Sequence, residues 1–491
     1  MTETRKSIGA QAAAGAAWSA AGFACLSLCG YAIAVMLARG LGPAAFGVYG
    51  VVYSVLLASE QVLRFGIPQA MTKLIGGGLT QDPARLEATG VWLALLVNLG
   101  GFAVLWTTAP WLADWLNLEN GAFFIRIAIL DLPFFGVYRV LTHVMSGRRD
   151  FRASGIATCV YGISRAGGIA VLLAMDALSI SGALLVNAAA SVIGFLVVAR
   201  LVGRRAFRPT LAEGSHVAST AVPITVADVA IQSLLGIDLW LLSATGASLA
   251  TGVRGEYVAA MNLARGPNLV AFVLVTVLVP LIARAQSTGQ HEAARRLVTG
   301  TTRFLVTLVL PACALVAANA SELMAVFFGD RYRDGAPLLA ILVFAQGFGF
   351  TALACLQAIM IGIGRAAVTA RRAYVALAAA VALNYALIPP FGAIGAALAA
   401  MLAFAVVNVL VGLAIRREIG VLLDVRKDLR AIAVTVVVAA VSWFVPVGHG
   451  WVLVEMSVLA LAYLAIAWWL GLIDKSDVAL LRGKSRAPAV D

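Results

Sequence analysis

Long apolar stretches recur along the whole length of this 491-residue chain, and many of them run for 20 residues or more. A helix needs about 20 such residues to cross the ~30 Å hydrocarbon core of a bilayer. Only 12% of the residues are charged, against about 25% in soluble domains, so water is not the main solvent of this fold. The pattern predicts an all-α polytopic membrane protein.

The apolar stretches divide into fourteen predicted transmembrane helices, which we number as spans one to fourteen. The N-terminus lacks a small-residue cleavage site after a short apolar core, so we expect no removable signal peptide and a retained first span. The predicted ranges are 9–38, 44–73, 86–110, 121–146, 152–174, 180–203, 216–243, 253–283, 296–319, 335–362, 368–388, 392–415, 430–447 and 450–471.

The arginines are distributed unevenly between the connections. The net charge is +12, but the basic residues flank the spans, which argues against nucleic-acid binding. They are concentrated in the even-numbered connections, whereas the odd-numbered connections are mostly short or acidic. The positive-inside rule then predicts that both termini are cytoplasmic.

The two halves of the chain share short motifs. Gly47-Val48-Tyr49 opens span two, and Gly255-Glu256-Tyr257 opens span eight. Six helices separate the two motifs, so the halves have the same orientation and are related by an axis along the membrane normal. We therefore expect two pseudo-symmetric six-helix bundles and a C-terminal helix pair. The predicted domains are 1–208 (spans one to six), 209–417 (spans seven to twelve), 418–472 (spans thirteen and fourteen) and a cytoplasmic tail, 473–491.

The sequence contains few of the features that an enzyme needs. The longest outer connection, around 319–334, is too short to fold as a catalytic domain, and the four histidines are scattered. We expect no catalytic residue, no metal site and no cofactor, so uphill transport would depend on H⁺, Na⁺ or the membrane potential. Paired bundles are typical of alternating-access transporters, although duplication also builds channels and scaffolds.

Ionisable residues inside the spans are the candidate functional residues, because each costs about 2.5–3.5 kcal/mol to insert at a helix centre. A guanidinium group favours phosphate, since its planar fork offers paired donors. Structural pairing, Glu60 with Arg64 and Asp131 with Arg139, is the alternative for these residues. The predicted anion-binding cavity contains Arg64, Arg139, Arg165 and Arg265; the candidates for coupling or charge pairing are Glu60, Asp131, Asp228, Asp238 and Arg303.

Three segments resemble the polysaccharide (O-antigen, Wzx-type) flippases of the multidrug/oligosaccharidyl-lipid/polysaccharide (MOP) superfamily. They are LGPAAFGVY at 41–49, GEYVAA at 255–260 and PPFGAIGAA at 389–397. The resemblance implies two bundles that alternate between inward- and outward-open states in a bacterial inner membrane. It implies an undecaprenyl-diphosphate-linked oligosaccharide as cargo, turned to the periplasmic leaflet for surface-polysaccharide assembly. The diphosphate would contact the cavity arginines, and the prenyl tail would stay in lipid.

Other functions remain open. Lipid II flippases of the superfamily use arginines in spans one, two and eight, and Arg64 and Arg265 match two of these spans. Span one here has no buried arginine. Multidrug/cation antiporters usually have twelve spans and a cationic cargo, and a non-transporting scaffold is a further alternative. The resemblance implies membrane lipids, a polysaccharide polymerase and assembly proteins as partners, and a monomeric chain.

Overall fold

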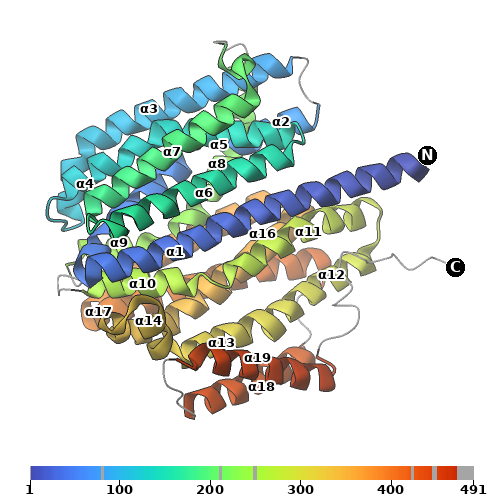
Figure 1. Cartoon of the computed structure of the whole chain (residues 1–491). Coiled ribbons are helices and arrows are strands. Elements are labelled where there is room, and N and C mark those ends of the chain that lie inside the picture. The colour runs from blue at the N-terminus through green and yellow to red at the C-terminus, as the bar shows by residue number, and fades with distance from the viewer. Residues whose placement is uncertain are drawn as a thin grey trace. The chain divides into compact units, whose positions relative to one another are not determined.

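A computed structural model describes residues 2–78, 82–208, 213–246, 252–421, 425–444 and 450–472, which are helical with no strand (Figure 1). The chain divides into two compact units, unit 1 (Met1–Gly255) and unit 2 (Glu256–Asp491). This division rests on contacts rather than on repeats, so the four predicted domains stay a prediction. The predicted tail, 473–491, lies outside the described residues.

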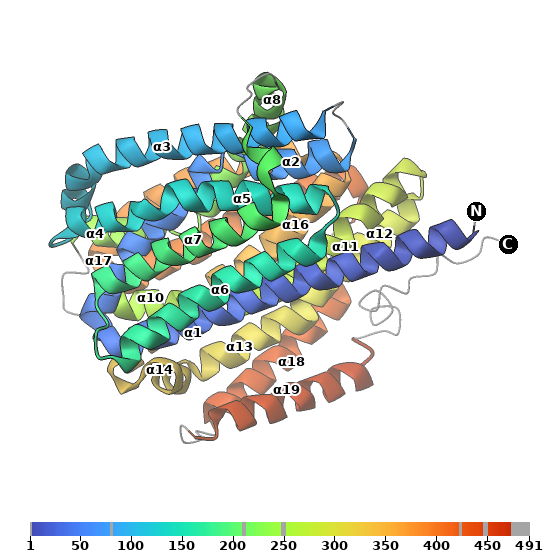
Figure 2. The ribbon, with the colours of Figure 1, turned by 45° about the horizontal axis from the view of Figure 1, so that its top comes forward.

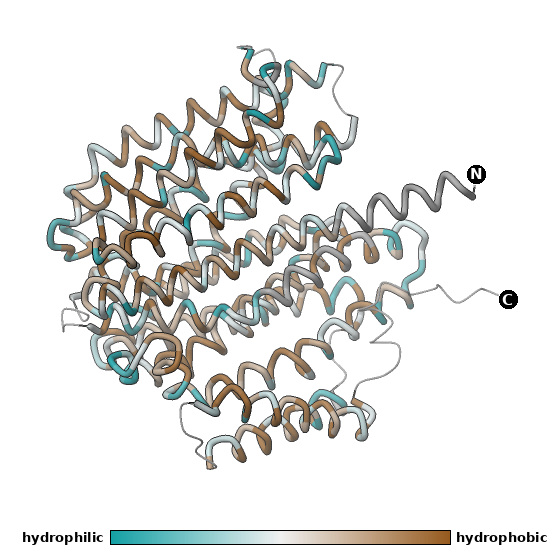
Figure 3. Tube along the Cα trace, in the orientation of Figure 1, coloured by the Kyte–Doolittle hydropathy of each residue, from teal (hydrophilic) through white to brown (hydrophobic). Residues whose placement is uncertain are grey.

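The all-α membrane fold is confirmed. Within the described residues, nine helices are long and apolar enough to cross a membrane, or ten if the bent pair α8 (Gly214–Ser233) and α9 (Ile237–Ala244) is one span. Apolar residues follow the lengths of the helices, and hydrophilic residues gather at their ends and connections (Figure 3). The count of fourteen spans stays a prediction.

Two helices are too long for a single crossing. They are α1 (Thr2–Leu63) and α17 (Ala366–Ile419), and at ~1.5 Å per residue each exceeds twice the ~30 Å hydrocarbon core. Each contains one glycine with non-helical backbone angles. This is Gly42 in α1 (φ 74°, ψ 170°) and Gly392 in α17 (φ 55°, ψ −131°). Glycine adopts a positive φ without a Cβ clash. Gly42 falls in the predicted connection between spans one and two, and Gly392 is the first residue of predicted span twelve.

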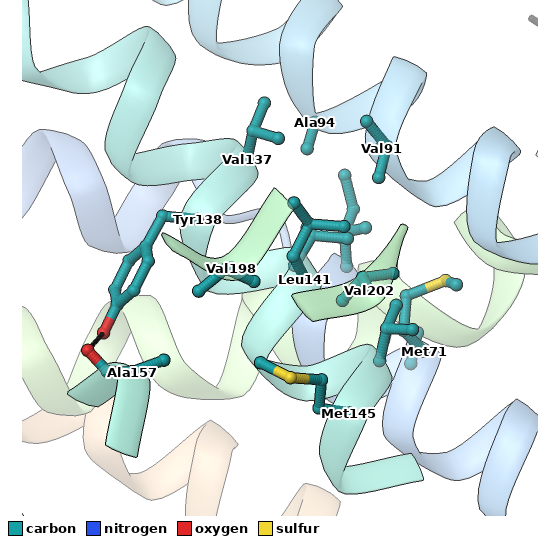
Figure 4. Close-up of a cluster of buried hydrophobic side chains, with 14 of the residues drawn as sticks. Met71, Val91, Ala94, Val137, Tyr138, Leu141, Met145, Ala157, Val198 and Val202 are labelled. Carbon is teal, nitrogen blue, oxygen red and sulfur yellow. Dashed lines mark hydrogen bonds between the residues drawn. The ribbon is translucent and has the colours of Figure 1, made fainter. Parts of the chain in front are cut away.

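Unit 1 packs its helices around an apolar core. Helix α1 packs along α6, α2 packs on α5, and α5 packs on both α3 and α7 (Figures 1 and 2). Met71, Leu141 and Val198 are buried together, and the Tyr138 hydroxyl donates to the Ala157 carbonyl at 3.5 Å (Figure 4). The further elements of this unit are α2 (Ile67–Gly76), α3 (Pro83–Trp115), α4 (Gly121–Ala128), the 3₁₀ turn η1 (Ile129–Asp131), α5 (Leu132–Gly147), α6 (Phe151–Ala174), α7 (Ile180–Val202) and η2 (Arg204–Phe207).

Unit 2 contains two π-helical segments, η3 (Leu305–Val309) and η5 (Val343–Gly349), inside longer helices. Such segments are frequent at functional sites. Helix α11 packs on α16, and α16 packs on α17. The other elements are α10 (Val253–Ala264), α11 (Asn268–Ser287), α12 (His291–Phe304), α13 (Leu310–Ala318), α14 (Ala320–Phe328), η4 (Asp330–Gly335), α15 (Ala336–Leu342), α16 (Phe350–Gly362), α18 (Val425–Phe444) and α19 (Val452–Trp469).

The predicted spans two (44–73) and eight (253–283) each contain a break in the helix. Span two is interrupted at Arg64–Gly66, where Phe65 and Gly66 have φ values of 48° and 60°. Span eight is interrupted at Arg265–Pro267. Pro68 and Pro267 lack the N–H that would continue each helix past these points. Both breaks therefore place an arginine where a membrane helix stops and a new one begins.

The helix pair α18–α19 packs on α13. Its buried apolar contacts are few and include Val438, Tyr463 and Leu315. A chain of hydrogen bonds also joins these helices: the Asn319 amide donates to the Ser442 hydroxyl at 2.7 Å, and this hydroxyl donates to the Glu455 carboxyl at 2.9 Å.

Candidate functional site

Three of the four predicted cavity arginines lie in unit 1. Arg64 follows the end of α1, Arg139 lies on α5 and Arg165 lies on α6. Arg64 and Arg139 are close enough to repel each other electrostatically. In the part of the chain that the structure describes, none of the three forms an ion pair with a carboxylate. Among the described residues, these three half-buried arginines are therefore not tied to an acid by a direct ion pair.

Arg64 is positioned by the break in span two. Its backbone N–H donates to the Glu60 carbonyl at 3.0 Å, and its side-chain Nε donates to the same oxygen at 3.3 Å. The residue lies just ahead of α2, whose N-terminus carries the positive end of the helix dipole. A guanidinium group and a helix N-terminus at one point inside the membrane favour an anion.

Arg139 adds a second positive charge beside Arg64. Its Nε is buried and has no hydrogen-bond partner among the described residues. His143, one turn further along α5, also interacts with both arginines, and its Nδ1 lies 3.0 Å from the Thr72 hydroxyl. A buried guanidinium nitrogen without an acceptor is costly, so this site would gain from a bound anion.

Arg165 is held by tyrosines. It donates to the Tyr53 hydroxyl at 2.8 Å, and its guanidinium carbon lies 5.3 Å from the centre of the Tyr53 ring and 5.7 Å from that of Tyr161. Tyr53 in turn stacks on Tyr49, with ring centroids 5.5 Å apart. Cation–π contacts of this kind stabilise a partly desolvated arginine. The sequence analysis missed these tyrosines. The four-residue spacings Tyr49–Tyr53 and Tyr161–Arg165 place each pair on one helix face and could have indicated the contacts.

Two acidic side chains meet deep in unit 1. Glu60 on α1 is 6% exposed and Asp131 at the end of η1 is 0% exposed. The two carboxyl groups are close enough to repel each other electrostatically, but neither Asp131 oxygen has a hydrogen-bond partner among the described residues. The alternative pairing of Asp131 with Arg139 is therefore not formed. Glu60 attracts Arg64 at longer range without an ion pair.

The remaining predicted acids of unit 1 lie on α8 and α9. Asp228 on α8 accepts a hydrogen bond from the Gln69 amide at 3.4 Å and attracts Arg64. Asp238 on α9 is fully buried, and its Oδ1 accepts the Leu239 backbone N–H at 3.0 Å. Asp228 thus belongs to the surroundings of Arg64, whereas Asp238 has a local backbone contact.

Arg265 and Arg303 lie in unit 2. Arg265 is at the break of span eight, and its Nε donates at 2.7 Å to Oε1 of Gln346, a fully buried residue of the π segment η5. Arg303 is half-buried in the last turn of α12, directly before the π segment η3. Each π segment therefore adjoins or contacts a predicted arginine. Gln346 was not among the candidates from the sequence, because a single buried glutamine carries no motif.

A cavity of about 740 Å³ lies within unit 1, between the second half of α1, the second half of α3 and the pair α8–α9. Its lining is mostly apolar and includes Leu63, the neighbour of Arg64, at one end and the tryptophans Trp111 and Trp115 at the other. Val104 and Trp111 in this lining are 60% and 69% exposed. We call this cavity the α1–α3–α8 groove.

No metal chemistry is indicated by the side chains. Among the residues that the structure describes, no group of three or more His, Cys, Asp or Glu side chains could hold a metal ion. The polar groups gathered in unit 1 are instead arginines, tyrosines and a carboxyl pair. Guanidinium and phenol groups are hydrogen-bond donors, and their chemistry suits the binding of an anion.

Interrupted membrane helices with arginines at the breaks define a class of multi-pass membrane proteins, the transporters with binding sites inside the bilayer. Residues 12–286, more than half of the chain, match the family described as polysaccharide biosynthesis protein. The chain belongs to this family, in agreement with the resemblance of the three motifs to polysaccharide flippases.

A curated relative is the "Probable lipid II flippase MurJ" of Rhizobium meliloti (strain 1021), 23% identical over 318 residues. The match covers 64% of this chain and 54% of the relative, so the matched region spans about half of that protein. Whole-protein activity and substrate therefore do not follow from this likeness.

Solved structures show the same fold. The lipid II flippase MurJ in an inward closed conformation has a TM-score of 0.76 at 13% identity, covering 93% of this chain and 99% of that one. An inward-facing multidrug resistance MATE transporter of the MOP superfamily has a TM-score of 0.60 at 17% identity, covering 80% and 94%. A MOP superfamily transporter from Pyrococcus furiosus, at 16% identity, also has a TM-score of 0.60, covering 82% and 94%.

Proposed function

We propose that this protein is a flippase that turns a polyprenyl-diphosphate-linked oligosaccharide from the cytoplasmic to the periplasmic leaflet for surface-polysaccharide assembly. The observation that carries the proposal is the pair Arg64 and Arg139, which repel each other and form no ion pair among the described residues, with Arg64 next to the start of α2. Membership of the polysaccharide biosynthesis family supports the oligosaccharide cargo.

The headgroup chemistry fits these residues. A diphosphate diester carries two negative charges, and guanidinium groups bind phosphate oxygens through paired N–H donors. Inside a region of low dielectric such contacts are stronger than in water. The breaks at Arg64–Gly66 and Arg265–Pro267 also interrupt the regular helix of one span in each unit. Bending there would let the protein alternate between its two openings.

A lipid II flippase is the second candidate, because the curated relative and the structure with a TM-score of 0.76 carry that name. Its cargo has the same polyprenyl-diphosphate headgroup, so the arginines do not separate the two. A multidrug/cation antiporter is the third candidate, and the buried arginine pair disfavours its cationic cargo.

Reconstitution into vesicles tests this assignment. Purified protein should move a fluorescent undecaprenyl-diphosphate-linked oligosaccharide between leaflets, at a rate well above that of protein-free vesicles. Lipid II and a lipophilic cation serve as the competing cargoes. Movement of lipid II alone would support the second candidate, and cation-driven proton exchange would support the third.

The rest of the cellular setting is also part of the proposal. We place both termini in the cytoplasm of a bacterium and the chain in its inner membrane as a monomer. The surrounding lipids and the polysaccharide polymerase and assembly proteins are its partners. The absence of enzymatic activity and the use of H⁺, Na⁺ or the membrane potential as the energy source belong to the same proposal.

We assign the α1–α3–α8 groove to the prenyl chain of the cargo. The groove begins at Leu63, next to Arg64, so a headgroup on that arginine would place the first isoprene units at the groove. Its apolar lining suits a hydrocarbon chain, and its exposed valine and tryptophan lie at the surface of the unit.

Filling this groove should slow the flipping of long-chain cargo. Val104→Trp adds bulk at an exposed position in the lining, and we expect a loss of about tenfold in the initial rate with undecaprenyl cargo. Leu96→Trp is the matched control, because Leu96 is 53% exposed on the same helix but outside the lining. Equal rates for the two variants would contradict the assignment.

A further inference from the structure

We propose that Gln346 is a positioning residue of the cargo site: it orients the Arg265 guanidinium group for an anionic headgroup and leaves the positive charge of that group in place. The inference rests on the proposed function, because it needs Arg265 to contact the diphosphate of the cargo during transport. It adds to the site a buried residue of unit 2 that was not a candidate from the sequence.

The contact between the two side chains is direct. The Arg265 Nε donates to Gln346 Oε1 at 2.7 Å, at the short end of the usual range for an N–H···O hydrogen bond. Gln346 is 0% exposed, whereas Arg265 is half-buried. The acceptor is therefore held inside the unit, and the arginine keeps part of its surface accessible to a ligand.

The π segment η5 holds Gln346 against the break of span eight. A Cβ on Gly347, the next residue of η5, would lie 2.8 Å from the Ala264 carbonyl oxygen, so a glycine here lets η5 approach the last residue before the break. Beyond the break, the Thr351 hydroxyl donates to Asn268 Oδ1 at 3.2 Å. The chain on both sides of Arg265 is thus fixed against the same part of span ten.

A guanidinium group that is already oriented binds a headgroup at a lower entropic cost. A free arginine side chain samples many rotamers, and binding in one geometry removes this freedom. The bond to Gln346 restricts the side chain during folding, so less freedom is lost when the cargo binds. Pre-organisation of this kind raises the affinity for the cargo without a further contact to it.

The neutral charge of the acceptor also matters. The glutamine oxygen orients the guanidinium group without cancelling its charge. A carboxylate at the same place would form an ion pair with the arginine and compete with the phosphate oxygens. Arg64, at the break of span two, also has its Nε on a neutral oxygen, the Glu60 carbonyl at 3.3 Å. Each broken span therefore contains an arginine that a neutral acceptor orients.

A double-mutant cycle on the flipping rate tests the coupling. The probe is fluorescent undecaprenyl-diphosphate-linked oligosaccharide, in vesicles with equal amounts of inserted full-length protein. Gln346→Met has a similar length but lacks the amide oxygen, and we expect about a fivefold loss of the initial rate because the arginine loses its orientation. Arg265→Ala should lose about 30-fold, as expected for a hydrogen bond to a charged group. In the Arg265→Ala background, Gln346→Met should cause no further loss.

Gln346→Glu separates positioning from packing. Glutamate fills nearly the same space as glutamine and accepts the same hydrogen bond, so a packing role predicts a smaller loss than that of Gln346→Met. A positioning role predicts a larger loss, about 20-fold, because the carboxylate forms an ion pair with Arg265 and competes with the headgroup.

Asn408→Leu is the matched control for the cycle. The Asn408 amide donates to the carbonyl of Gly349, the last residue of η5, at 2.9 Å. Its removal disturbs the same π segment without removing the acceptor of Arg265. Any loss of rate in this variant should therefore persist in the Arg265→Ala background. Gel filtration shows which variants fold, and Gln346→Asn, which shortens the side chain, replaces Gln346→Met in the cycle if the methionine variant does not.

The possible outcomes are distinct. The inference is overturned if Gln346→Met causes no loss, or the same fractional loss with and without Arg265, because the glutamine then acts independently of the arginine. A smaller loss in Gln346→Glu than in Gln346→Met overturns it too. Wild-type flipping by Arg265→Ala also overturns it and leaves the proposed function intact, since Arg64 and Arg139 carry that function. Failure of the wild-type protein to move the probe contradicts the proposed function itself.

Discussion

Arg139→Ala should reduce the initial rate of lipid-linked oligosaccharide flipping by about 30-fold. A hydrogen bond to a charged group contributes about 1.5–3 kcal/mol, and the buried Nε of Arg139 has no acceptor among the described protein groups. An anionic headgroup would supply that acceptor. Arg139→Lys keeps the charge but loses the planar fork of the guanidinium group. Its flipping rate should therefore lie between those of the wild-type protein and Arg139→Ala. The assay is fluorescent-cargo translocation in vesicles with equal amounts of inserted protein.

Arg126→Ala is the matched control for this experiment. Arg126 lies on α4 of the same unit, where its guanidinium contacts the Trp106 ring at 5.4 Å and donates to the Trp106 carbonyl at 3.3 Å. Its loss removes one arginine without touching the pair Arg64 and Arg139, so flipping should stay near the wild-type rate. If Arg139→Ala flips cargo as fast as this control, the headgroup does not bind at Arg139.

Arg148→Ala should lower the free energy of unfolding by about 3 kcal/mol. Arg148 binds both oxygens of Glu87, with Nε to Oε1 at 2.6 Å and the terminal nitrogen on Oε2. The Glu87 side chain is 2% exposed, whereas that of Arg148 is 35% exposed. Breaking a buried ion pair costs about 3–5 kcal/mol because an unpaired charge remains, and the partial exposure of Arg148 favours the lower end.

The double variant Glu87→Gln/Arg148→Met checks that interpretation. It removes both charges together, so most of the lost stability should return. Denaturation in a mild detergent is monitored by tryptophan fluorescence. It gives the unfolding midpoints of the wild-type protein, Arg148→Ala and the double variant. A double variant no more stable than Arg148→Ala would show that the unpaired carboxylate of Glu87 does not cause the loss.

Much of the fold could be predicted because composition and periodicity act over many residues. Spans of 20 apolar residues, the turn at Gly42 and the turn at Gly392 are all readable from local sequence. The breaks in spans two and eight were also readable in principle, since Pro68 and Pro267 follow arginines closely. The predicted ranges 44–73 and 253–283 contain these prolines, but a proline inside an apolar stretch does not by itself indicate a break, because membrane helices tolerate proline.

The partners of the buried charges could not be predicted. Glu60 and Arg64 are four residues apart, which places them on one helix face, but α1 ends at Leu63 and their side chains form no ion pair. Asp131 and Arg139 lie on one predicted span, yet the 3₁₀ turn η1 changes the rotation of the chain between them. Small changes in helix rotation decide which acid meets which base, and local sequence does not encode them.

The attachment of the helix pair α18–α19 should depend only weakly on temperature. Lipid tails are as apolar as leucine, so burial against α13 offers this pair little hydrophobic gain. The hydrogen bonds from Asn319 through Ser442 to Glu455 therefore carry more of its attachment than they would in water. Hydrophobic attraction weakens on cooling, whereas these polar contacts do not depend on it. The pair should consequently stay attached in cold-adapted membranes.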